Sequence, residues 1–480
     1  MSDLHPHQPT GPFLDGRQVD GTGSVGVRDP FDGALVTTVE TGDAAMVRRA
    51  IGVAAAHLPP APAGERARVL TTAAAMVEAD AEHFARTICL EAGKPITQAR
   101  GEVARCVETL RFAAAEALTM TGEMVPMDAS AYGAGKVGML VRTPIGVVGA
   151  ISPFNFPLNL VAHKAAPAIA AGCPLVLKPA SATPLSALLL ARVLTDAGLP
   201  AGALAVIPGP SDAVGATIVE HPNVPMISFT GSGPVGWGIA RAQPAKRVAL
   251  ELGNSSPVVI AADADLELAA ARIAASGFTH AGQSCVSVQR VYVERGAHPR
   301  LLRLLADAVD ALVVGDPHDD ATDVGPVIDR DSQKRVMAWI AGARRGGATV
   351  VTGGTQDGRL IAPTVLDGIT PRMKVSCEEV FGPVVGVAAV GSVDEGIALA
   401  NGTPFGLQAA IFTSRIDRAL GWAARLHFGG VLVNETPTFR VDQQPYGGVK
   451  ESGNTREGPR WAARHMTEQK LVVLPVADAP

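Results

Sequence analysis

The spacing of apolar positions predicts a helical start to the chain. Up to about residue 120, apolar side chains recur every three or four residues among Ala, Glu and Arg, a period typical of helices that bury one face. The pattern predicts helices over 43–57, 63–90 and 99–118, after a loose arm at 1–25 and a short strand at 36–39.

Residues 121–143 interrupt this pattern with glycines and prolines between short apolar runs. Such punctuation predicts a β-hairpin that projects from the helical body. A second isolated strand is expected at 469–475, after the last helix. Because projecting strands leave unpaired edges that can pair with another chain, these two segments predict an oligomerisation element.

From residue 145, short apolar runs alternate with helical segments. The expected strands are 146–151, 175–178, 204–207, 226–229 and 247–250, and the helices between them are 158–171, 184–197, 212–220 and 235–240. This alternation predicts βαβ units in a parallel, doubly wound sheet. Ligands of such sheets bind at the carboxyl ends of the strands.

A second α/β pattern begins after Gly253. Its expected strands are 258–261, 288–293, 384–390, 409–413 and 430–434, and its helices are 265–280, 298–313, 330–346, 393–401 and 415–427. The fold class is therefore α/β, with a Rossmann-type sheet followed by a second α/β domain.

Composition supports a large enzyme. The chain has 480 residues, of which 47% are hydrophobic and 18% charged, so two or three domains with extensive buried sheet are expected. The net charge of −5 lacks the basic excess of a nucleic-acid binder. No apolar run reaches the roughly 18 residues of a membrane helix, and residues 1–12 do not resemble a signal peptide.

Five cysteines are scattered without pairing or CxxC spacing: Cys89, Cys106, Cys173, Cys285 and Cys377. This distribution indicates neither a disulfide framework nor a metal site, and it favours a reducing, cytoplasmic location.

Cys285 is the candidate nucleophile. It lies where the helical pattern 265–280 passes through Gly282 into the strand pattern 288–293, and a thiol at such a turn can open into a cleft. A reactive cysteine needs surroundings that favour its thiolate. The alternative is a buried structural cysteine, which is the commoner role of a lone Cys.

The sequence Gly231-Ser232-Gly233-Pro234-Val235-Gly236 contains GxGxxG between a strand and a helix. Such a loop directs backbone N–H groups toward phosphates. Glu251 ends the next strand, and it could bind a ribose in a dinucleotide site or act as a catalytic carboxylate. The motif alone leaves both interpretations open.

Three further residues follow strands. Asn155 lies in Ser-Pro-Phe-Asn-Phe-Pro and could donate to an oxyanion or cap the next helix. Lys178 could reach an adenosine ribose or phosphate, or lie on the surface. Glu379, in Glu-Glu-Val-Phe-Gly-Pro, could bind a ribose diol or belong to a polar loop.

Taken together, the motifs PFNFP, KP, FTGS, ELG, GQSC, EEVFGP and YGGVKESG, in that order, resemble the NAD(P)-dependent aldehyde dehydrogenase superfamily. The resemblance spans about residues 15–475. A series in fixed order is far more specific than any single motif.

This resemblance implies a role for each catalytic candidate. Cys285 would attack the aldehyde carbonyl, and Asn155 with the Cys285 N–H would hold the oxyanion. After hydride transfer to NAD or NADP, Glu251 would activate the water that hydrolyses the thioester. The residues implied in cofactor binding are Ser152, Phe154, Lys178, Ser181, Gly231, Ser232, Gly236, Leu252, Glu379 and Phe381.

The resemblance also implies a division into domains. Residues 1–120 and 144–252 would bind the cofactor, 253–440 would form the catalytic domain, and 121–143 with 441–480 would form the oligomerisation element of a homodimer or homotetramer.

Two departures from the family pattern matter. Asn254 replaces the second Gly of ELGG, and we expect the turn to survive because Asn tolerates left-handed backbone. Ser181 stands where strict NAD users often carry Glu. Without that carboxylate, a 2′-phosphate would not be repelled, so NADP could be accepted.

The sequence around these motifs is most similar to the branch of the superfamily that contains lactaldehyde, sulfoacetaldehyde and phosphonoacetaldehyde dehydrogenases. We therefore hypothesise that Arg105 and His163 line the entrance and bind the anionic group of a short aldehyde. The alternative is that Arg105 pairs with Glu102 or Glu108 on the surface of its helix.

Two other functions compete with hydrolytic oxidation of an aldehyde. One is CoA-acylating oxidation, which Glu251 disfavours because acyl transfer to CoA needs no water-activating base. The other is a non-catalytic binding or structural member of the family, which the intact set of Cys285, Asn155 and Glu251 disfavours.

Overall fold

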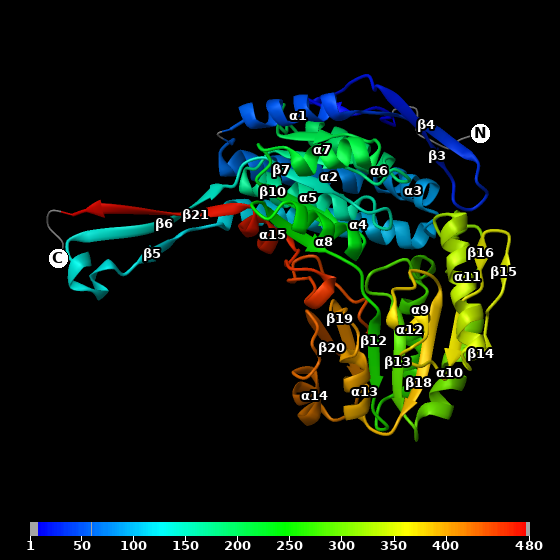
Figure 1. Ribbon diagram of the computed structural model, residues 1–480. Coiled ribbons are helices and arrows are strands. Elements are labelled where there is room, and N and C mark those ends of the chain that lie inside the picture. Colours follow the sequence, from blue (N-terminus) through cyan, green and yellow to red (C-terminus); the bar gives the residue numbers. More distant parts are fainter. Residues whose placement is uncertain (1–7, 59, 477–480) are drawn as a thin grey trace.

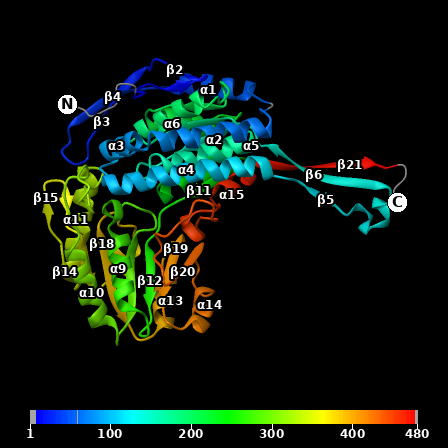
Figure 2. The ribbon, with the colours of Figure 1, turned by 180° about the vertical axis from the view of Figure 1, so that it is seen from behind.

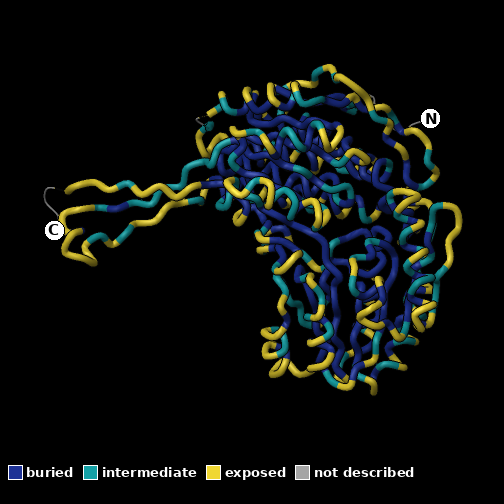
Figure 3. Tube along the Cα trace, in the orientation of Figure 1, coloured by how far each residue is buried: buried dark blue, intermediate teal, exposed yellow. Residues whose placement is uncertain are grey.

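The computed structural model describes residues 8–58 and 60–476. Two seven-stranded sheets form the body of the molecule, and a slender arm projects from it (Figure 1). Dark, buried chain runs through both sheets, whereas the arm is largely exposed (Figure 3). The predicted α/β fold class is confirmed.

The first sheet has the strand order β11-β10-β7-β8-β9-β1-β2. Its parallel strands are β7 (Val148–Ile151), β8 (Leu175–Lys178), β9 (Leu204–Val206), β10 (Met226–Thr230) and β11 (Arg247–Glu251). Strands β8 and β9 lie on one side of β7, and β10 and β11 on the other. The carboxyl ends of β7 and β10 therefore flank the point where the order reverses, which is where such sheets bind ligands.

The loose arm expected at 1–25 is only partly described, because residues 1–7 lie outside the described residues. The rest is ordered differently from the prediction. Strands β1 (Phe13–Leu14) and β2 (Arg17–Gln18) form an antiparallel edge of the first sheet, and β3 (Gly23–Arg28) pairs with β4 (Leu35–Thr41). Strands β1, β2 and β3 were not predicted because the apolar runs between the glycines are too short to show an alternating pattern.

The helices of the first half pack on the first sheet or on one another. They are α1 (Ala44–Ala56), α2 (Ala63–Ala79), α3 (Ala81–Ala92), α4 (Ile96–Thr119), α5 (Asn159–Ala171), α6 (Leu185–Asp196), α7 (Ala216–Glu220), α8 (Gly233–Ala242) and α15 (Pro459–His465). The single helix predicted over 63–90 is wrong. Asp80, with φ −109° and ψ 25°, leaves helical geometry and separates α2 from α3.

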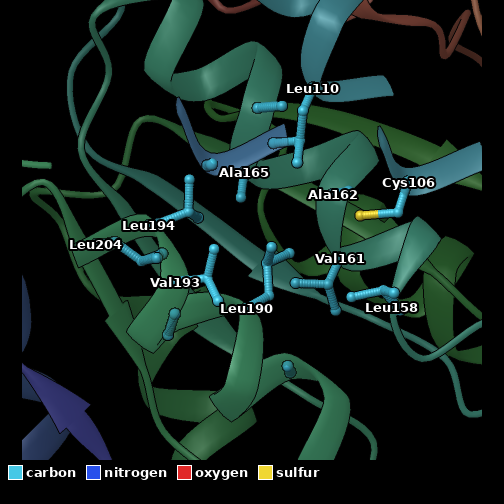
Figure 4. Packing of buried hydrophobic residues seen from close by; sticks show 14 of the residues in the cluster. Cys106, Leu110, Leu158, Val161, Ala162, Ala165, Leu190, Val193, Leu194 and Leu204 are labelled. Carbon is cyan, nitrogen blue, oxygen red and sulfur yellow. The ribbon is translucent and has the colours of Figure 1, made fainter. Parts of the chain in front are cut away.

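The core of this half joins three helices. Cys106 and Leu110 of α4 pack with Val161 of α5 and Leu190 of α6 (Figure 4). All four side chains are at least 98% buried. Because interiors are close-packed, α4 is held at a fixed position against α5, and both helices carry residues of the candidate site.

The second sheet has the order β14-β17-β18-β13-β12-β19-β20, in which β14 is antiparallel to its neighbour. Its strands are β12 (Ser256–Ile260), β13 (Val288–Glu294), β14 (Thr349–Thr352), β17 (Thr364–Asp367), β18 (Val384–Val390), β19 (Gln408–Phe412) and β20 (Gly430–Val433). The predicted strands of this sheet are confirmed, whereas β14 and β17 were not predicted. A small hairpin of β15 (Gln356–Asp357) and β16 (Leu360–Ile361) stands apart.

The helices of the second half are α9 (Leu266–Gly277), α10 (His298–Asp310), α11 (Arg330–Arg345), α12 (Lys374–Cys377), α13 (Val393–Asn401) and α14 (Ile416–Ala423). Within the described ranges, every helix is too short or too polar to span a bilayer.

The arm is a three-stranded antiparallel sheet of β21, β6 and β5. Strands β5 (Glu123–Val125) and β6 (Lys136–Pro144) form the predicted hairpin, and β21 (Thr467–Pro475) pairs with β6 along its whole length. Both views show the arm reaching well beyond the body (Figures 1 and 2).

Candidate active site

A cavity of about 840 Å³ lies where the two sheets meet. Ile151, Lys178, Phe229 and Glu251 bring the carboxyl ends of four strands of the first sheet to its wall. Cys285, which precedes β13 of the second sheet, also lines the cavity. Residues next to both sheets therefore line the cavity.

Cys285 is partly exposed on the cavity wall, and its Sγ lies 2.9 Å from the hydroxyl oxygen of Tyr446. Burial raises the pKa of the Cys285 thiol to about 12, while the hydrogen bond from Tyr446 acts in the opposite direction. The other cysteines near the first core, Cys89, Cys106 and Cys173, are fully enclosed. Cys285 thus differs from them in being partly exposed on the cavity wall.

The backbone before Cys285 is left-handed at three successive residues. His280, Ala281 and Gly282 have φ values of 49°, 53° and 71°, and such runs are costly for residues with a Cβ. Gln98 of α4 accepts a hydrogen bond from His280 N at 2.7 Å, and Gln283 donates from Nε2 to His280 O at 3.1 Å. Two glutamines therefore hold the strained turn that presents the nucleophile.

Asn155 follows β7 and is 4% exposed. Its Nδ2 donates to Gln283 O at 2.9 Å, which places the amide beside the turn that carries Cys285. The same segment is fixed from α4, because Glu102 Oε1 accepts hydrogen bonds from Leu158 N at 2.9 Å and Asn159 N at 3.0 Å. Helix α4 thus supports both the Asn155 segment and the Cys285 turn.

Glu251 ends β11 and is 5% exposed. Neither of its carboxylate oxygens has a hydrogen-bond partner among the described residues. Burial raises the pKa of Glu251 well above its usual range, and the Glu457 carboxylate raises it further, against the charges of Arg440 and Lys164. A buried carboxyl with a raised pKa is suited to taking a proton.

Asn254 occupies the position of the missing glycine. Its φ is not left-handed, so the expected need for a tolerant backbone does not arise. Its side chain instead donates to Ser256 Oγ at 2.8 Å and Gln408 O at 3.1 Å, and its N–H donates to Glu379 Oε1 at 2.9 Å. Asn254 thereby ties the turn after Glu251 to the second sheet.

Glu379 and Phe381 also line the cavity. Burial raises the pKa of Glu379 to about 7, against the hydrogen bond from Asn254 and the charge of Arg335. A Cβ at Gly253 would come within 2.3 Å of a Glu379 oxygen, so any other residue at 253 would force the Glu379 carboxylate to shift. The rings of Phe154 and Phe381 meet edge to face at 5.7 Å.

The remaining predicted cofactor residues divide into two groups. Those on the cavity wall are Ser152, Lys178, Ser181, Gly231, Ser232 and Leu252. Gly236 lies instead within α8, where a Cβ would come within 2.5 Å of the Leu252 side chain. Its glycine permits close packing of α8 on β11 and does not reach the cavity wall.

Arg105 lines the cavity. It pairs with neither Glu102 nor Glu108, the two partners on its own helix that the sequence offered. Its guanidinium makes two hydrogen bonds to Asp442, at 2.9 and 3.2 Å, and its side chain is 31% exposed. His163 does not line the cavity. It is fully buried, with Nε2 at 2.9 Å from Asp442 Oδ1 and at 3.2 Å from Arg440 Nη2, so it can act on a cavity anion only through these two neighbours.

Sequence reasoning missed a cluster of charged and phenolic side chains at this end. Arg440, Tyr446 and Glu457 line the cavity, and Lys164 lies 3.9 Å from Glu457. Arg440 Nη2 donates to Glu457 Oε2 at 3.0 Å, and its guanidinium lies 3.9 Å from the centre of the Tyr446 ring. Tyr446 opens the YGGVKESG motif, which was the one available signal; Arg440 precedes it in an aperiodic segment.

The described part of the chain contains no group of three His, Cys, Asp or Glu side chains placed to share a metal ion. The donors around the cavity fit a dinucleotide instead. Hydroxyls and a lysine lie at strand ends of the first sheet, and a carboxylate and two aromatic rings that contact each other also line the cavity.

Residues 18–472 match the model of the aldehyde dehydrogenase family. The chain belongs to that family. It is 43% identical to a 3-sulfolactaldehyde dehydrogenase of Priestia aryabhattai over 410 residues, which cover 85% of this chain and 86% of the relative. The expected class of NAD(P)-dependent oxidoreductase is therefore confirmed.

Solved aldehyde dehydrogenase structures superpose closely. Aldehyde dehydrogenase 21 from Physcomitrella patens, solved with the product succinate, has a TM-score of 0.95 at 37% identity, covering 98% of this chain and 99% of that one. An NADP-dependent glyceraldehyde-3-phosphate dehydrogenase from Bacillus halodurans, complexed with NADP, has a TM-score of 0.95 at 35% identity. The match covers 98% of this chain and 100% of that one.

Proposed function

We propose that this aldehyde dehydrogenase oxidises a short anionic aldehyde to its carboxylic acid through a thioester on Cys285. The observation that carries the proposal is that Cys285, Asn155 and Glu251 all line one cavity. Residues suited to a dinucleotide line the same cavity, so nucleophile, oxyanion donor, base and cofactor site can act on one substrate.

The proposed chemistry uses these three side chains in turn. The Cys285 thiolate attacks the carbonyl carbon, and the carbonyl electrons move to an oxyanion that Asn155 Nδ2 stabilises. The bound NAD(P)+ supplies a hydride acceptor. Glu251 then takes a proton from water, and the resulting hydroxide adds to the thioester carbon. The C–S bond breaks, which releases the carboxylic acid and restores the Cys285 thiolate.

The residues proposed to hold the cofactor follow the cavity wall. Lys178 and Ser181 would face the adenosine ribose, Ser232 the pyrophosphate, and Glu379 the nicotinamide ribose. Because Ser181 carries no charge and the Lys178 ammonium lies nearby, the site would admit the 2′-phosphate of NADP as well as NAD.

Reduction of NAD and NADP by the purified protein tests the reaction. The panel would contain propanal, benzaldehyde, lactaldehyde, succinic semialdehyde and phosphonoacetaldehyde. Cys285→Ala is expected to abolish turnover while cofactor binding persists. Free carboxylic acid as product supports hydrolysis, whereas product that appears only with added CoA would establish the acylating alternative.

The anionic substrate is proposed from the cations at the aldehyde end of the cavity. Arg105 and Arg440 line the wall, and the Arg440 Nε has no hydrogen-bond partner among the described residues. A guanidinium binds carboxylate, sulfonate or phosphonate groups through paired N–H donors. His163 would act indirectly, by fixing the Asp442 carboxylate that orients Arg105.

Arg105→Leu tests this assignment. It is expected to raise KM for an anionic aldehyde about tenfold or more, the loss of one charge-assisted contact, and to leave propanal unchanged. Arg111→Leu on the same helix is the matched control, because Arg111 pairs with Glu78 and Glu108 at the surface. Equal effects on both aldehydes would contradict an anion site at Arg105.

A homodimer or homotetramer is proposed from the arm. Strand β21 is an unpaired edge, and exposed apolar side chains such as Met124, Leu471 and Leu474 lie along the arm. Exposed edges of this kind pair with other chains. Sedimentation should give two or four chains, and Leu471→Asp should shift the protein toward the monomer; a monomeric wild type would contradict the proposal.

The proposed division into domains assigns 1–120 and 144–252 to cofactor binding, 253–440 to catalysis, and 121–143 with 441–480 to oligomerisation. The cytoplasmic location also stays a prediction, supported by five cysteines that are all unpaired.

A further inference from the structure

Tyr446 touches the sulfur of the nucleophile. Its hydroxyl oxygen lies 2.9 Å from Cys285 Sγ, and its side chain is 3% exposed. The ring packs with Val286 and Leu407. Because the phenol is buried and held by these neighbours, its hydroxyl has a fixed direction toward the thiol.

The segment that carries Tyr446 is fixed by its backbone. Tyr446 N donates to Glu457 O at 3.1 Å, and Glu457 N donates to Tyr446 O at 2.6 Å. The Arg440 guanidinium covers the ring at 3.9 Å and is itself bound by Glu457 Oε2. A cation over the ring stabilises negative charge that develops on the phenol oxygen, which strengthens the hydroxyl as a hydrogen-bond donor.

We propose that Tyr446 is a further catalytic residue. Its hydroxyl group donates a hydrogen bond to the Cys285 thiolate and thereby increases the fraction of Cys285 that is ionised before attack. This role rests on the proposed function of Cys285 as nucleophile.

The direction of the hydrogen bond follows from the charge state. A neutral thiol could donate to the phenol oxygen, but a thiolate can only accept. The thiol proton leaves to water in the cavity, and Tyr446 keeps its own proton. When the C–S bond forms, the sulfur loses its negative charge to the carbonyl oxygen and the hydrogen bond weakens.

The groups around the thiol oppose its ionisation more than they favour it, so a hydrogen-bond donor to the thiolate would matter. Burial raises the pKa of Cys285 most, and the Tyr446 hydrogen bond is the largest effect that lowers it. Glu379 from the segment before β18 and Glu251 from β11 both oppose the thiolate, while Arg440 favours it. The described residues give Sγ no other side-chain hydrogen bond.

The hydroxyl does nothing for packing that a phenyl ring would not do. Tyr446→Phe keeps the ring, its stacking on Arg440 and its contacts with Val286, so it removes the hydrogen bond alone. The chain contains three tyrosines. Tyr292→Phe is the matched control, because Tyr292 is also 3% exposed but bonds Arg290, away from the cavity.

The test is the rate of Cys285 alkylation by iodoacetamide as a function of pH, without aldehyde or cofactor, read by mass spectrometry of the Cys285 peptide. Tyr446→Phe is expected to raise the apparent thiol pKa and to slow alkylation at neutral pH about tenfold, as loss of a charge-assisted hydrogen bond implies. Tyr292→Phe should match wild type. An unchanged or lowered thiol pKa in Tyr446→Phe would overturn the proposal.

This readout is separate from turnover. A protein that oxidises none of the aldehydes still reports its thiol pKa, so failure of the proposed function and failure of the Tyr446 role are distinguishable. If Tyr446→Phe does not fold, incorporation of fluorotyrosine gives a second measurement. The more acidic phenol should lower the thiol pKa, and an unchanged value would again overturn the role of Tyr446.

Discussion

The two ends of the cavity are built differently. At the end that we propose binds the cofactor, short polar side chains such as Ser181 and Ser232 follow regular strands of the first sheet, and Lys178 ends β8. At the end that we propose binds the aldehyde, a largely buried network is formed by Arg105, Asp442, Arg440, Glu457 and Glu251. The backbone shapes the first end, whereas interlocked charges shape the second.

This contrast suggests how each end responds to change. A site made by strand ends keeps its form when one side chain is altered, because the sheet holds the backbone. In a buried charge network, removing one partner leaves another uncompensated. Substitutions at the aldehyde end should therefore cost more than those at the cofactor end.

The largest effect is expected for Glu251→Gln. Loss of a general base should lower steady-state turnover about 100- to 10,000-fold. Acylation should survive, so a rapid-mixing experiment should show about one equivalent of reduced cofactor per active site before turnover stalls. Loss of this burst along with turnover would show that Glu251 is needed before the thioester forms.

Asn155→Ala should come next. A single preorganised oxyanion donor contributes about 100- to 1000-fold to kcat, and KM should change little because the donor acts on the developing charge. Steady-state kinetics measure both constants. A change confined to KM would assign Asn155 to ground-state binding instead.

Asp442→Asn tests the network through stability. Burial would raise the pKa of Asp442, but hydrogen bonds from His163 and Arg105 outweigh it and hold that pKa well below its usual range. The carboxylate therefore stabilises the fold above the unfolded-state pKa of about 4, and this stability is lost as the pH falls through the folded-state value. Because Arg105 is partly exposed, we expect a loss of about 2 kcal/mol at pH 7.

Urea unfolding at several pH values measures this effect. The difference between wild type and Asp442→Asn should narrow as the pH falls below about 4. Asp417→Asn is the control, because its pair with Arg415 lies in solvent and should matter little. A pH-independent difference would attribute the loss to packing.

The smallest effect is expected at the cofactor end, from Glu379. Burial raises the pKa of this carboxyl to about 7. A ribose hydroxyl donates best to the carboxylate, so cofactor affinity should rise about tenfold between pH 6 and pH 8 as Glu379 ionises. Fluorescence titration should show this dependence lost in Glu379→Gln and kept in Glu378→Gln, whose carboxyl is exposed.

The same contrast explains what the sequence could predict. Strand ends of a parallel sheet meet at one edge, so Asn155, Lys178 and Glu251 could be placed near a common ligand site from the strand pattern alone. The spacing of apolar residues and the turn residues of the sequence cannot show that Arg105 pairs with Asp442, which lies 337 residues further along the chain. Nor can they show that His163, hypothesised to line the entrance, is buried and bonds Asp442.

Local backbone geometry was equally hidden. The helix pattern 265–280 predicts a regular end, yet α9 stops at Gly277 and left-handed residues follow. Gln98, from the other half of the molecule, supports that geometry. A turn stabilised across two sheets leaves no periodic trace in either segment.

The position of α15 and β21 has a consequence for how the polypeptide is made. Ala463 and Met466 belong to the core of the first half, and Met466 O accepts a hydrogen bond from Cys173. During synthesis, domains generally fold as units, with the N-terminal one first. Here the half that emerges first from the ribosome lacks part of its interior until residues 459–475 follow. The core of the first half therefore stays incompletely packed until the whole second sheet has been translated.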